Sequence, residues 1–113
     1  MTPLQKRRFP EKVEFMTSAG FIEGKGAREA RGLRGGGMLA VVTDIGVLEP
    51  DDSGEMMLTA LHTGRTAEEA KANTGWNLKI AEHVKTTEQV TKKELKILRE
   101  ELDPTGIYLK GAA

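Results

Sequence analysis

Residues 38–62 constrain the fold more than any other part of the chain, because two β-prone runs flank a turn-rich acidic segment. MLAVVTD at 38–44 has the length and the β-branched residues typical of a strand buried on both faces, and IGVLEP continues it toward a sheet edge. PDDSGE at 50–55 supplies turn residues, and EMMLTALH at 55–62 forms the second run. We predict a long β-hairpin over 38–62. Its tip at 51–54 is expected to tolerate insertions, since loop entropy grows slowly with length.

A first helix is predicted over 67–74 by the residues at its two ends. Thr66 is followed three residues later by Glu69, which is the spacing of a capping box. Gly75 suits the left-handed residue that often ends a helix. The segment NLKIAE at 77–82 then alternates apolar and polar residues, so it is predicted to be a half-buried strand.

A second helix over 92–102 is the most firmly defined element of the sequence. Thr91 and Glu94 repeat the capping box, and Asp103-Pro104 stops the helix. Three leucines fall at helical spacing inside it: Leu95, Leu98 and Leu102.

The part of the chain before residue 38 is expected to hold one strand and a long loop. Val13, Phe15 and Met16 form a short, partly alternating apolar segment, which predicts a strand over 12–17. Seven glycines between Gly20 and Gly37 indicate a loop with one helical turn near 27–31. The whole order of elements predicts a single domain over 1–113 of the α/β class, or α+β if the hairpin dominates.

The composition excludes several classes of partner and site. Seventeen basic residues balance seventeen acidic ones, so no overall field attracts nucleic acid or an anionic membrane. Without cysteine there is neither a disulfide framework nor a thiolate metal site, and the charged start after Met1 favours a cytoplasmic protein. Leu, Ile, Val and Phe number only 25 of 113 residues, so we expect a partner to complete the core.

Two groups of residues suggest anion binding only weakly. GLRGGG at 32–37 precedes a predicted strand, whereas a phosphate loop follows a strand and opens a helix. GKGARE at 24–29 lacks an adjoining strand, so it too is interpreted as loop. Arg28, Arg31 and Arg34 would share one side of a helix and could hold a phosphate, but a solvated face is the preferred interpretation.

No catalytic or metal-binding constellation emerges from the other reactive side chains. His62 and His83 lie on different predicted elements without a metal-site spacing, so no metal is predicted. Ser18 and Ser53 have no histidine nearby. The acidic pairs at 51–52 and 100–101 are interpreted as solubilising charges, and Trp76 as a packing residue over the hairpin.

Three stretches, taken in order, resemble a known family: KRRFPEKVEFMTSAGF at 6–21, the run from GLRGGG to KANTGW at 32–76, and KKELKILREELDPTGIY at 92–108. They are similar to the C-terminal part of the B-type subunit of class I CoA-transferases of the glutaconate type. In that family a KRRF-type start leads to a strand ending in TSPG, a glycine-rich stretch, a VVTD strand entering a hairpin, and an LHPG turn. Ala19 and Thr63 depart from this pattern, since each replaces a proline.

The resemblance implies a Rossmann-like fold, with a short parallel or mixed sheet, a long hairpin and two helices. It also implies a ping-pong reaction in which a glutamate attacks an acyl-CoA and becomes a glutamyl-CoA thioester. In the family that glutamate and the oxyanion loop precede the KRRF-like start, which is at Lys6 here. We therefore predict no catalytic residue in this chain, assign no cofactor-binding residue, and expect no covalently bound cofactor, with the coenzyme A thioester as substrate.

Three interpretations of the chain's role stay open at this point. It is a fragment or separately encoded half of a transferase subunit, a stand-alone relative that serves binding or assembly, or an unrelated small enzyme. The expected partners are a second copy of the chain, a complementary segment or the A-type subunit, with neither nucleic acid nor membrane.

Overall fold

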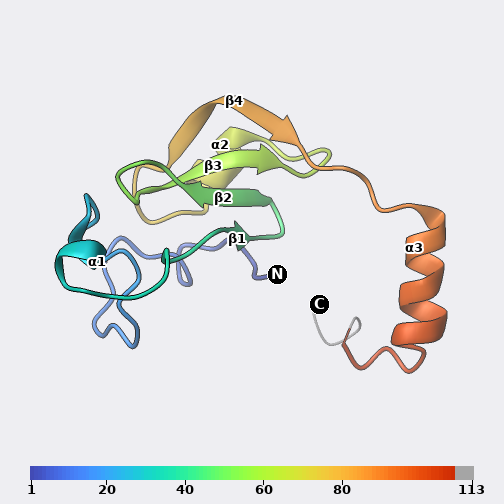
Figure 1. The fold of residues 1–113 in the computed structure, drawn as a ribbon. Coiled ribbons are helices and arrows are strands. Elements are labelled where there is room, and N and C mark those ends of the chain that lie inside the picture. Colours follow the sequence, from blue (N-terminus) through green and yellow to red (C-terminus); the bar gives the residue numbers. More distant parts are fainter. Residues whose placement is uncertain (109–113) are drawn as a thin grey trace.

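The computed structural model describes residues 1–108 and contains a mixed four-stranded sheet with short helices (Figure 1). In chain order the elements are α1 (Ala27–Ala30), β1 (Val41–Val42), β2 (Gly46–Pro50), β3 (Met56–Leu61), α2 (Ala67–Ala72), β4 (Lys79–Thr86), α3 (Lys92–Lys96) and the π-helical turn η1 (Ile97–Leu102). The strands lie in the order β1-β2-β3-β4, with the first two pairs antiparallel and β3–β4 parallel. The predicted fold, a mixed sheet with a hairpin and two main helices, is confirmed.

The hairpin is present but shorter than predicted. β2 and β3 pair from Gly46 to Leu61, and the chain turns back between Pro50 and Met56. The expected strand over 38–44, buried on both faces, is wrong. Val41–Val42 pairs with β2 on one side, and on the other side the run has only a single parallel bridge between Thr43 and Thr2, while Leu39 is 85% exposed. A run of this kind needs full neighbouring strands on both sides to be buried, and among residues 1–108 the second neighbour is this one bridge.

The turn between β1 and β2 is closed by Thr43, whose side chain is fully buried. Its hydroxyl donates to the Gly46 carbonyl at 2.7 Å and accepts from the Gly46 amide at 3.0 Å. The Thr43 amide also donates to the Gly46 carbonyl at 2.9 Å. This closed turn ends β1 and reverses the chain into β2.

The strand predicted over 12–17 is also wrong for this structure. Residues 10–19 are all exposed and irregular, with no strand partner among residues 1–108. The sequence pattern is that of a strand, but a strand forms only where another strand accepts its hydrogen bonds.

The helix predicted over 67–74 is present as α2, which connects the two parallel strands. The Thr66 hydroxyl accepts the amide of Glu69 at 3.1 Å, as its cap position predicts. Gly75 does not end the helix in a left-handed conformation, contrary to the sequence prediction. It is glycine because a Cβ there would lie 2.9 Å from the carbonyl oxygen of Phe9 and 2.7 Å from the amide nitrogen of Glu11.

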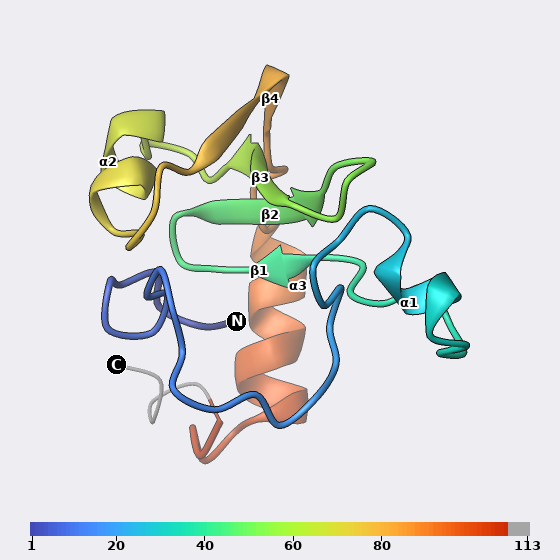
Figure 2. The ribbon, with the colours of Figure 1, turned by 90° about the vertical axis from the view of Figure 1, so that its left-hand side faces the viewer.

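The core is small and lies between the sheet, α2 and the N-terminal residues. Among residues 1–108, six apolar side chains are buried: Leu4, Ile45, Leu48, Leu58, Ala70 and Leu78. Trp76 packs half-buried against this cluster, in agreement with its predicted packing role. The Leu4 amide donates to the Asp44 carboxylate at 2.7 Å, which holds the N-terminal segment beside β1 (Figure 2).

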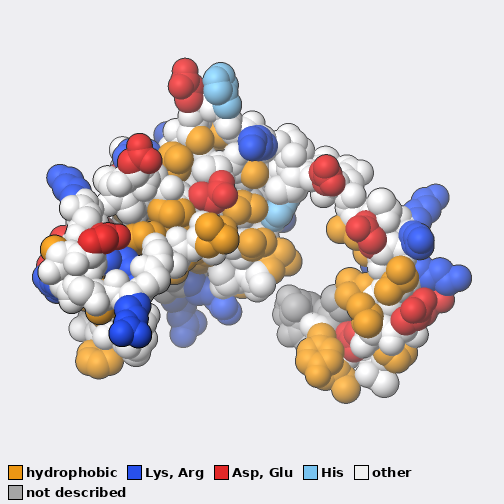
Figure 3. All heavy atoms as spheres, viewed as in Figure 1, with side chains coloured by type: hydrophobic (Ala, Val, Ile, Leu, Met, Phe, Trp, Pro, Cys, Tyr) orange, Lys and Arg blue, Asp and Glu red, His pale blue; other side chains and the backbone are white. Residues whose placement is uncertain are grey.

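The last helix stands apart from the sheet. α3 and η1 cover the predicted range 92–102 and begin with a complete capping box at Thr91 and Glu94. Figure 1 shows an extended linker leading to them, and Figure 3 shows an open gap between this helix and the body. Within the described part of the chain, no helix is long and apolar enough to cross a membrane.

Candidate functional site

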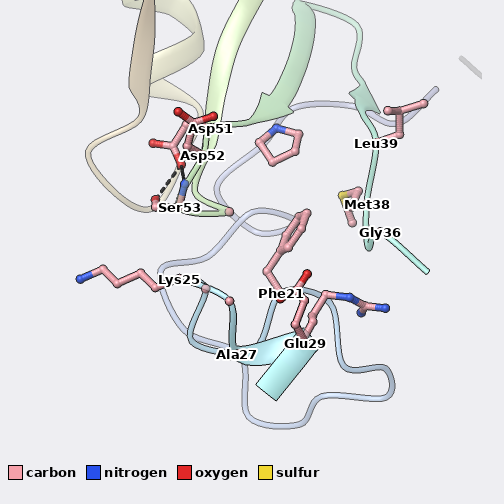
Figure 4. A pocket seen from close by; sticks show the side chains of 15 residues that line it. Phe21, Lys25, Ala27, Glu29, Gly36, Met38, Leu39, Asp51, Asp52 and Ser53 are labelled. Atoms are coloured by element: carbon pink, nitrogen blue, oxygen red, sulfur yellow. Dashed lines mark hydrogen bonds between the residues drawn. The ribbon is translucent and has the colours of Figure 1, made fainter. Parts of the chain in front are cut away.

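The glycine-rich loop and the tip of the β2–β3 hairpin enclose a pocket. Figures 1 and 2 show that the loop bearing α1 lies at the end of the sheet where β2 turns into β3. The pocket between them has a volume of about 410 Å³ and is lined from the loop by Phe21, Arg28 and Met38 and from the tip by Pro50 and Asp51, among others (Figure 4).

Asp51 organises the hairpin tip. One oxygen of its carboxylate accepts the Ser53 hydroxyl at 2.6 Å and the amides of Ser53 and Glu55 at 2.9 and 3.0 Å. The other oxygen contacts the ammonium of Lys79 on β4, which also pairs with Glu55 at 3.1 Å. The lysine and these donors hold the pKa of Asp51 well below its usual range, and Asp51 in turn raises the pKa of Lys79.

The glycine-rich loop is fastened to this tip. The Lys25 amide donates to the Ser53 carbonyl at 2.8 Å, and a Cβ at Gly24 would lie 2.3 Å from the same oxygen. The ring of Phe21 packs on Gly54, whose φ of +85° lies in the left-handed region that favours glycine. The tip therefore carries contacts from two other segments, which argues against the predicted tolerance of insertions at 51–54.

The three arginines do not form an anion site. Arg28 donates to the carbonyls of Gly20 and Arg34 at 2.6 and 2.8 Å, so its guanidinium holds the loop closed. Arg31 pairs with Glu23 at 2.6 Å instead, and α1 ends at Ala30. The glycines at 35–37 lead into β1 and not into a helix, which agrees with their interpretation as a connector.

Neither histidine is placed as a metal ligand among residues 1–108. His62 contacts the Thr43 carbonyl through Nε2 at 2.8 Å and the Thr87 hydroxyl through Nδ1 at 2.8 Å. A carbonyl only accepts, so Nε2 carries the proton and the imidazole ties the β1–β2 turn to the end of β4. His83 is exposed on β4. Among residues 1–108 no three His, Cys, Asp or Glu side chains gather as metal ligands would.

None of the carboxylates in the described residues is placed as a nucleophile. Every glutamate is exposed except Glu69, which is half-buried and pairs with Arg65 at 2.6 Å. The one shifted glutamate is Glu94, whose pKa is lowered by the amide and hydroxyl of Thr91. The Ser53 hydroxyl donates a hydrogen bond to Asp51. The lowered pKa of Asp51 makes this carboxylate a weak base, so it does not activate Ser53.

The sequence analysis singled out Arg28 and the acidic pair at 51–52, which line this pocket, but did not predict that they meet there or that Lys79 and Phe21 join them. Asp51 followed by Ser53 is a pattern typical of a side chain that folds its own turn, so the local part could have been predicted. Lys79 lies 28 residues further on, and Phe21 belongs to a stretch interpreted only as loop. No spacing in the sequence relates either residue to the tip.

The chain is similar in sequence to B subunits of CoA-transferases. It is 44% identical over 94 residues to the B subunit of 3-oxoadipate CoA-transferase from Pseudomonas knackmussii, a match that covers 82% of this chain and 36% of the relative. It is 37% identical over 108 residues to the B subunit of glutaconate CoA-transferase from Acidaminococcus fermentans, covering 94% and 40%. No protein-family model matches the chain.

The fold of the chain is also similar to that of two solved structures. The crystal structure of glutaconate coenzyme A-transferase from Acidaminococcus fermentans superposes with a TM-score of 0.85 and 36% identity, over 95% of this chain and 42% of that chain. Rhodococcus jostii RHA1 IpdAB shares the fold, with a TM-score of 0.76 at 22% identity over 45% of its own chain. The chain thus spans about two-fifths of the length of the proteins it matches.

Proposed function

We propose that this chain, which is homologous to a region of the B subunits of CoA-transferases, acts as a scaffold component of such a subunit in the transfer of CoA between an acyl-CoA and a carboxylic acid. The observation that carries the proposal is the agreement of sequence and fold, with 44% identity to one such subunit and a TM-score of 0.85 to another transferase. The substrate is a coenzyme A thioester, and no covalently bound cofactor is proposed.

The catalytic carboxylate is proposed to lie in the part of a B-type subunit that this chain does not span. A carboxylate that attacks a thioester carbonyl has to be removed from water and aimed, because a hydrated carboxylate is a weak nucleophile. Twelve of the 13 glutamates are exposed, and Glu69 is held by Arg65. The isolated 113-residue chain is therefore expected to be inactive, and its contribution is structural.

The proposed partners follow from the names of the relatives, which are subunits of larger enzymes. An A-type subunit or a complementary transferase segment is the first partner, and self-association into a homo-oligomer is the second. Exposed apolar residues support association, since Met1, Leu39 and Phe15 are 80–89% exposed. A cytoplasmic location stays a prediction.

Covalent trapping tests the expectation that the isolated chain is catalytically inactive. The isolated chain is incubated with acyl-CoA and treated with borohydride, which reduces any glutamyl-CoA thioester to a stable alcohol. The chain is then digested for mass analysis. We expect no modified glutamate. A complete B-type subunit treated in parallel with its A-type subunit provides the positive control. A modified glutamate in the isolated chain would contradict the assignment of a scaffold role.

A second candidate is a stand-alone binding or assembly module without catalysis. It is favoured by the pocket of about 410 Å³ at the hairpin tip, which is built without an activated nucleophile. Native mass spectrometry with and without coenzyme A separates the two functions. A stable monomer that binds coenzyme A by itself supports the module, whereas a chain that only associates supports the scaffold.

A further inference from the structure

The glycine-rich loop, residues 20–37, is a self-contained unit that rests on the body of the molecule. Arg28 closes it internally by donating to the carbonyls of Gly20 and Arg34, near its two ends. None of the residues 20–37 is fully buried, and none belongs to the core cluster or packs against it. Segments with few buried contacts are the ones that open locally while the rest of a domain stays folded.

One backbone hydrogen bond fastens this loop to the hairpin tip. The Lys25 amide donates to the Ser53 carbonyl at 2.8 Å. Gly24 allows this approach, because a Cβ there would lie 2.3 Å from the same carbonyl oxygen. The bond reports directly on whether the loop and the tip are together, since its donor and its acceptor belong to the two different segments.

The ring of Phe21 is the second contact between the loop and the tip. A Cβ built on Gly54 of the tip would lie 3.0 Å from one ring carbon, and a Cβ built on Gly37 would lie 2.8 Å from another. The ring therefore lies against two positions without side chains, one in the tip and one at the end of the loop. Figure 4 shows the Phe21 side chain between the tip at Ser53 and the segment at Met38.

The backbone of the loop is strained next to these contacts. Ile22 and Lys25 have φ of +56° and +51°, in the left-handed region that residues with a Cβ adopt at a cost in free energy. Such strain persists only while the surrounding contacts impose it, and it is found at segments that switch between two states. The strain in the loop therefore opposes the contacts that hold the loop on the tip.

We propose that the glycine-rich loop is a latch that opens and closes on the hairpin tip, held closed by the Phe21 ring and driven open by the strain at Ile22 and Lys25. The pocket takes one wall from the loop and the other from the tip, so it exists only while the latch is closed. A ligand that touches both walls binds the closed form alone and shifts the equilibrium toward it. The inference concerns the chain by itself and goes beyond its proposed role in a transferase subunit.

Hydrogen–deuterium exchange of the chain at increasing low concentrations of urea tests the latch. Local opening exposes little surface, so its exchange rate hardly depends on urea, whereas exchange through global unfolding accelerates as urea rises. We expect the Lys25 amide to exchange at least about 100-fold faster than the protected amides of β3, at a rate that low urea does not change.

Two results of this measurement would overturn the latch. If the Lys25 amide follows the β3 amides at every urea concentration, the loop is a fixed part of the domain. If the Lys25 amide exchanges as fast as in an unstructured peptide, the closed form is not populated. Neither result requires a substituted chain.

Phe21→Ala tests whether the ring holds the latch closed. The Lys25 amide should exchange about tenfold faster in this variant, as expected for the loss of a half-buried ring, while the β3 amides keep their rates. Phe15→Ala is the matched control, because Phe15 is 80% exposed, and it should leave the Lys25 amide unchanged. Equal rates in the two variants would show that the ring does not hold the loop.

Lys25→Gly tests whether the strain opens the latch. Lys25 is exposed and its side chain points away from the other pocket residues in Figure 4, so the substitution removes the left-handed strain without removing a packed group. The amide at position 25, corrected for the intrinsic exchange rate of glycine, should become protected at least about threefold more. Lys12→Gly, at an exposed lysine whose φ is not positive, should have no effect on this amide. Unchanged or reduced protection in Lys25→Gly would overturn the role of the strain.

Discussion

Replacement of Gly46 by alanine probes the point where the two strands of the hairpin approach most closely. Gly46 is buried at the start of β2, opposite Leu61 of β3. A Cβ built on it lies 2.2 Å from the carbonyl oxygen of Ala60 and 3.2 Å from a methyl carbon of Leu58. The first contact is with backbone, so no side-chain rotation relieves it.

The expected cost follows from this geometry. Ordinary contact begins at 3.4 Å, so β2 and β3 have to separate by about 1 Å at this position. Overpacking of this kind costs about 1–3 kcal/mol, and weakening one ladder hydrogen bond adds about 1 kcal/mol. The free energy of unfolding should therefore fall by about 2–4 kcal/mol, a large share of the roughly 5–15 kcal/mol typical of a whole domain.

Urea denaturation monitored by circular dichroism measures the effect. With a slope of about 1–3 kcal/mol per molar urea, the midpoint of Gly46→Ala should move down by roughly 0.7–4 M. Gly36→Ala is the matched control, because no atom lies within 4 Å of a Cβ there and its φ is not positive. It should stay within about 0.5 kcal/mol of the parent. Equal midpoints for the two variants would refute the reasoning.

Three further perturbations test other parts of the structure. The pKa of Asp51 is lower in the folded chain than its ordinary value of 3.8, so at pH values between the two the unfolded chain binds a proton that the folded chain does not. The stability that Asp51 contributes is therefore full above pH 3.8 and is lost progressively as the pH falls from 3.8 toward the lowered pKa. An acid titration of stability should accordingly be shallower for Asp51→Asn, and parallel curves would argue against the tip network. Thr91→Ala removes the cap of α3 at a cost of about 1 kcal/mol, so amides over 92–102 should exchange faster while those of β3 do not change. Inserting two glycines between Asp52 and Ser53 should lower the urea midpoint, because the insertion separates Asp51 from the groups it binds; an unchanged midpoint would restore the view of a tolerant tip.

Features that depend on neighbouring residues could be predicted from the sequence. The caps at Thr66 and Thr91 act within three residues, and both helices begin where they indicate. The turn residues at 50–55 likewise fold locally, so the hairpin is present with its tip at the predicted place. Such interactions form within one turn of chain, and no distant residue has to arrive first.

The candidate pocket was only partly predictable. The family resemblance was confirmed by the relatives and by the fold, but it named no residue at the hairpin tip. The arginines at 28, 31 and 34 follow a regular spacing, yet the helix that would align them ends at Ala30. A spacing of three becomes a shared face only where the helix continues.

The sequence by itself determined the turn at 50–55, where the helices begin and which runs favour an extended backbone, but the prediction that 45–50 continues the strand of 38–44 is wrong, because the chain reverses at Thr43–Gly46. Only the tertiary structure decided which of those runs became strands. MLAVVTD pairs over two residues, and 12–17 does not pair at all within residues 1–108. Only the tertiary structure shows that position 75 has no room for a side chain, because the backbone of Phe9 and Glu11 lies against it. It also shows that Lys79 pairs with Asp51. The physical reason is that a strand, a close approach and a distant ion pair each need a second segment, and a linear pattern does not state which segment arrives beside it.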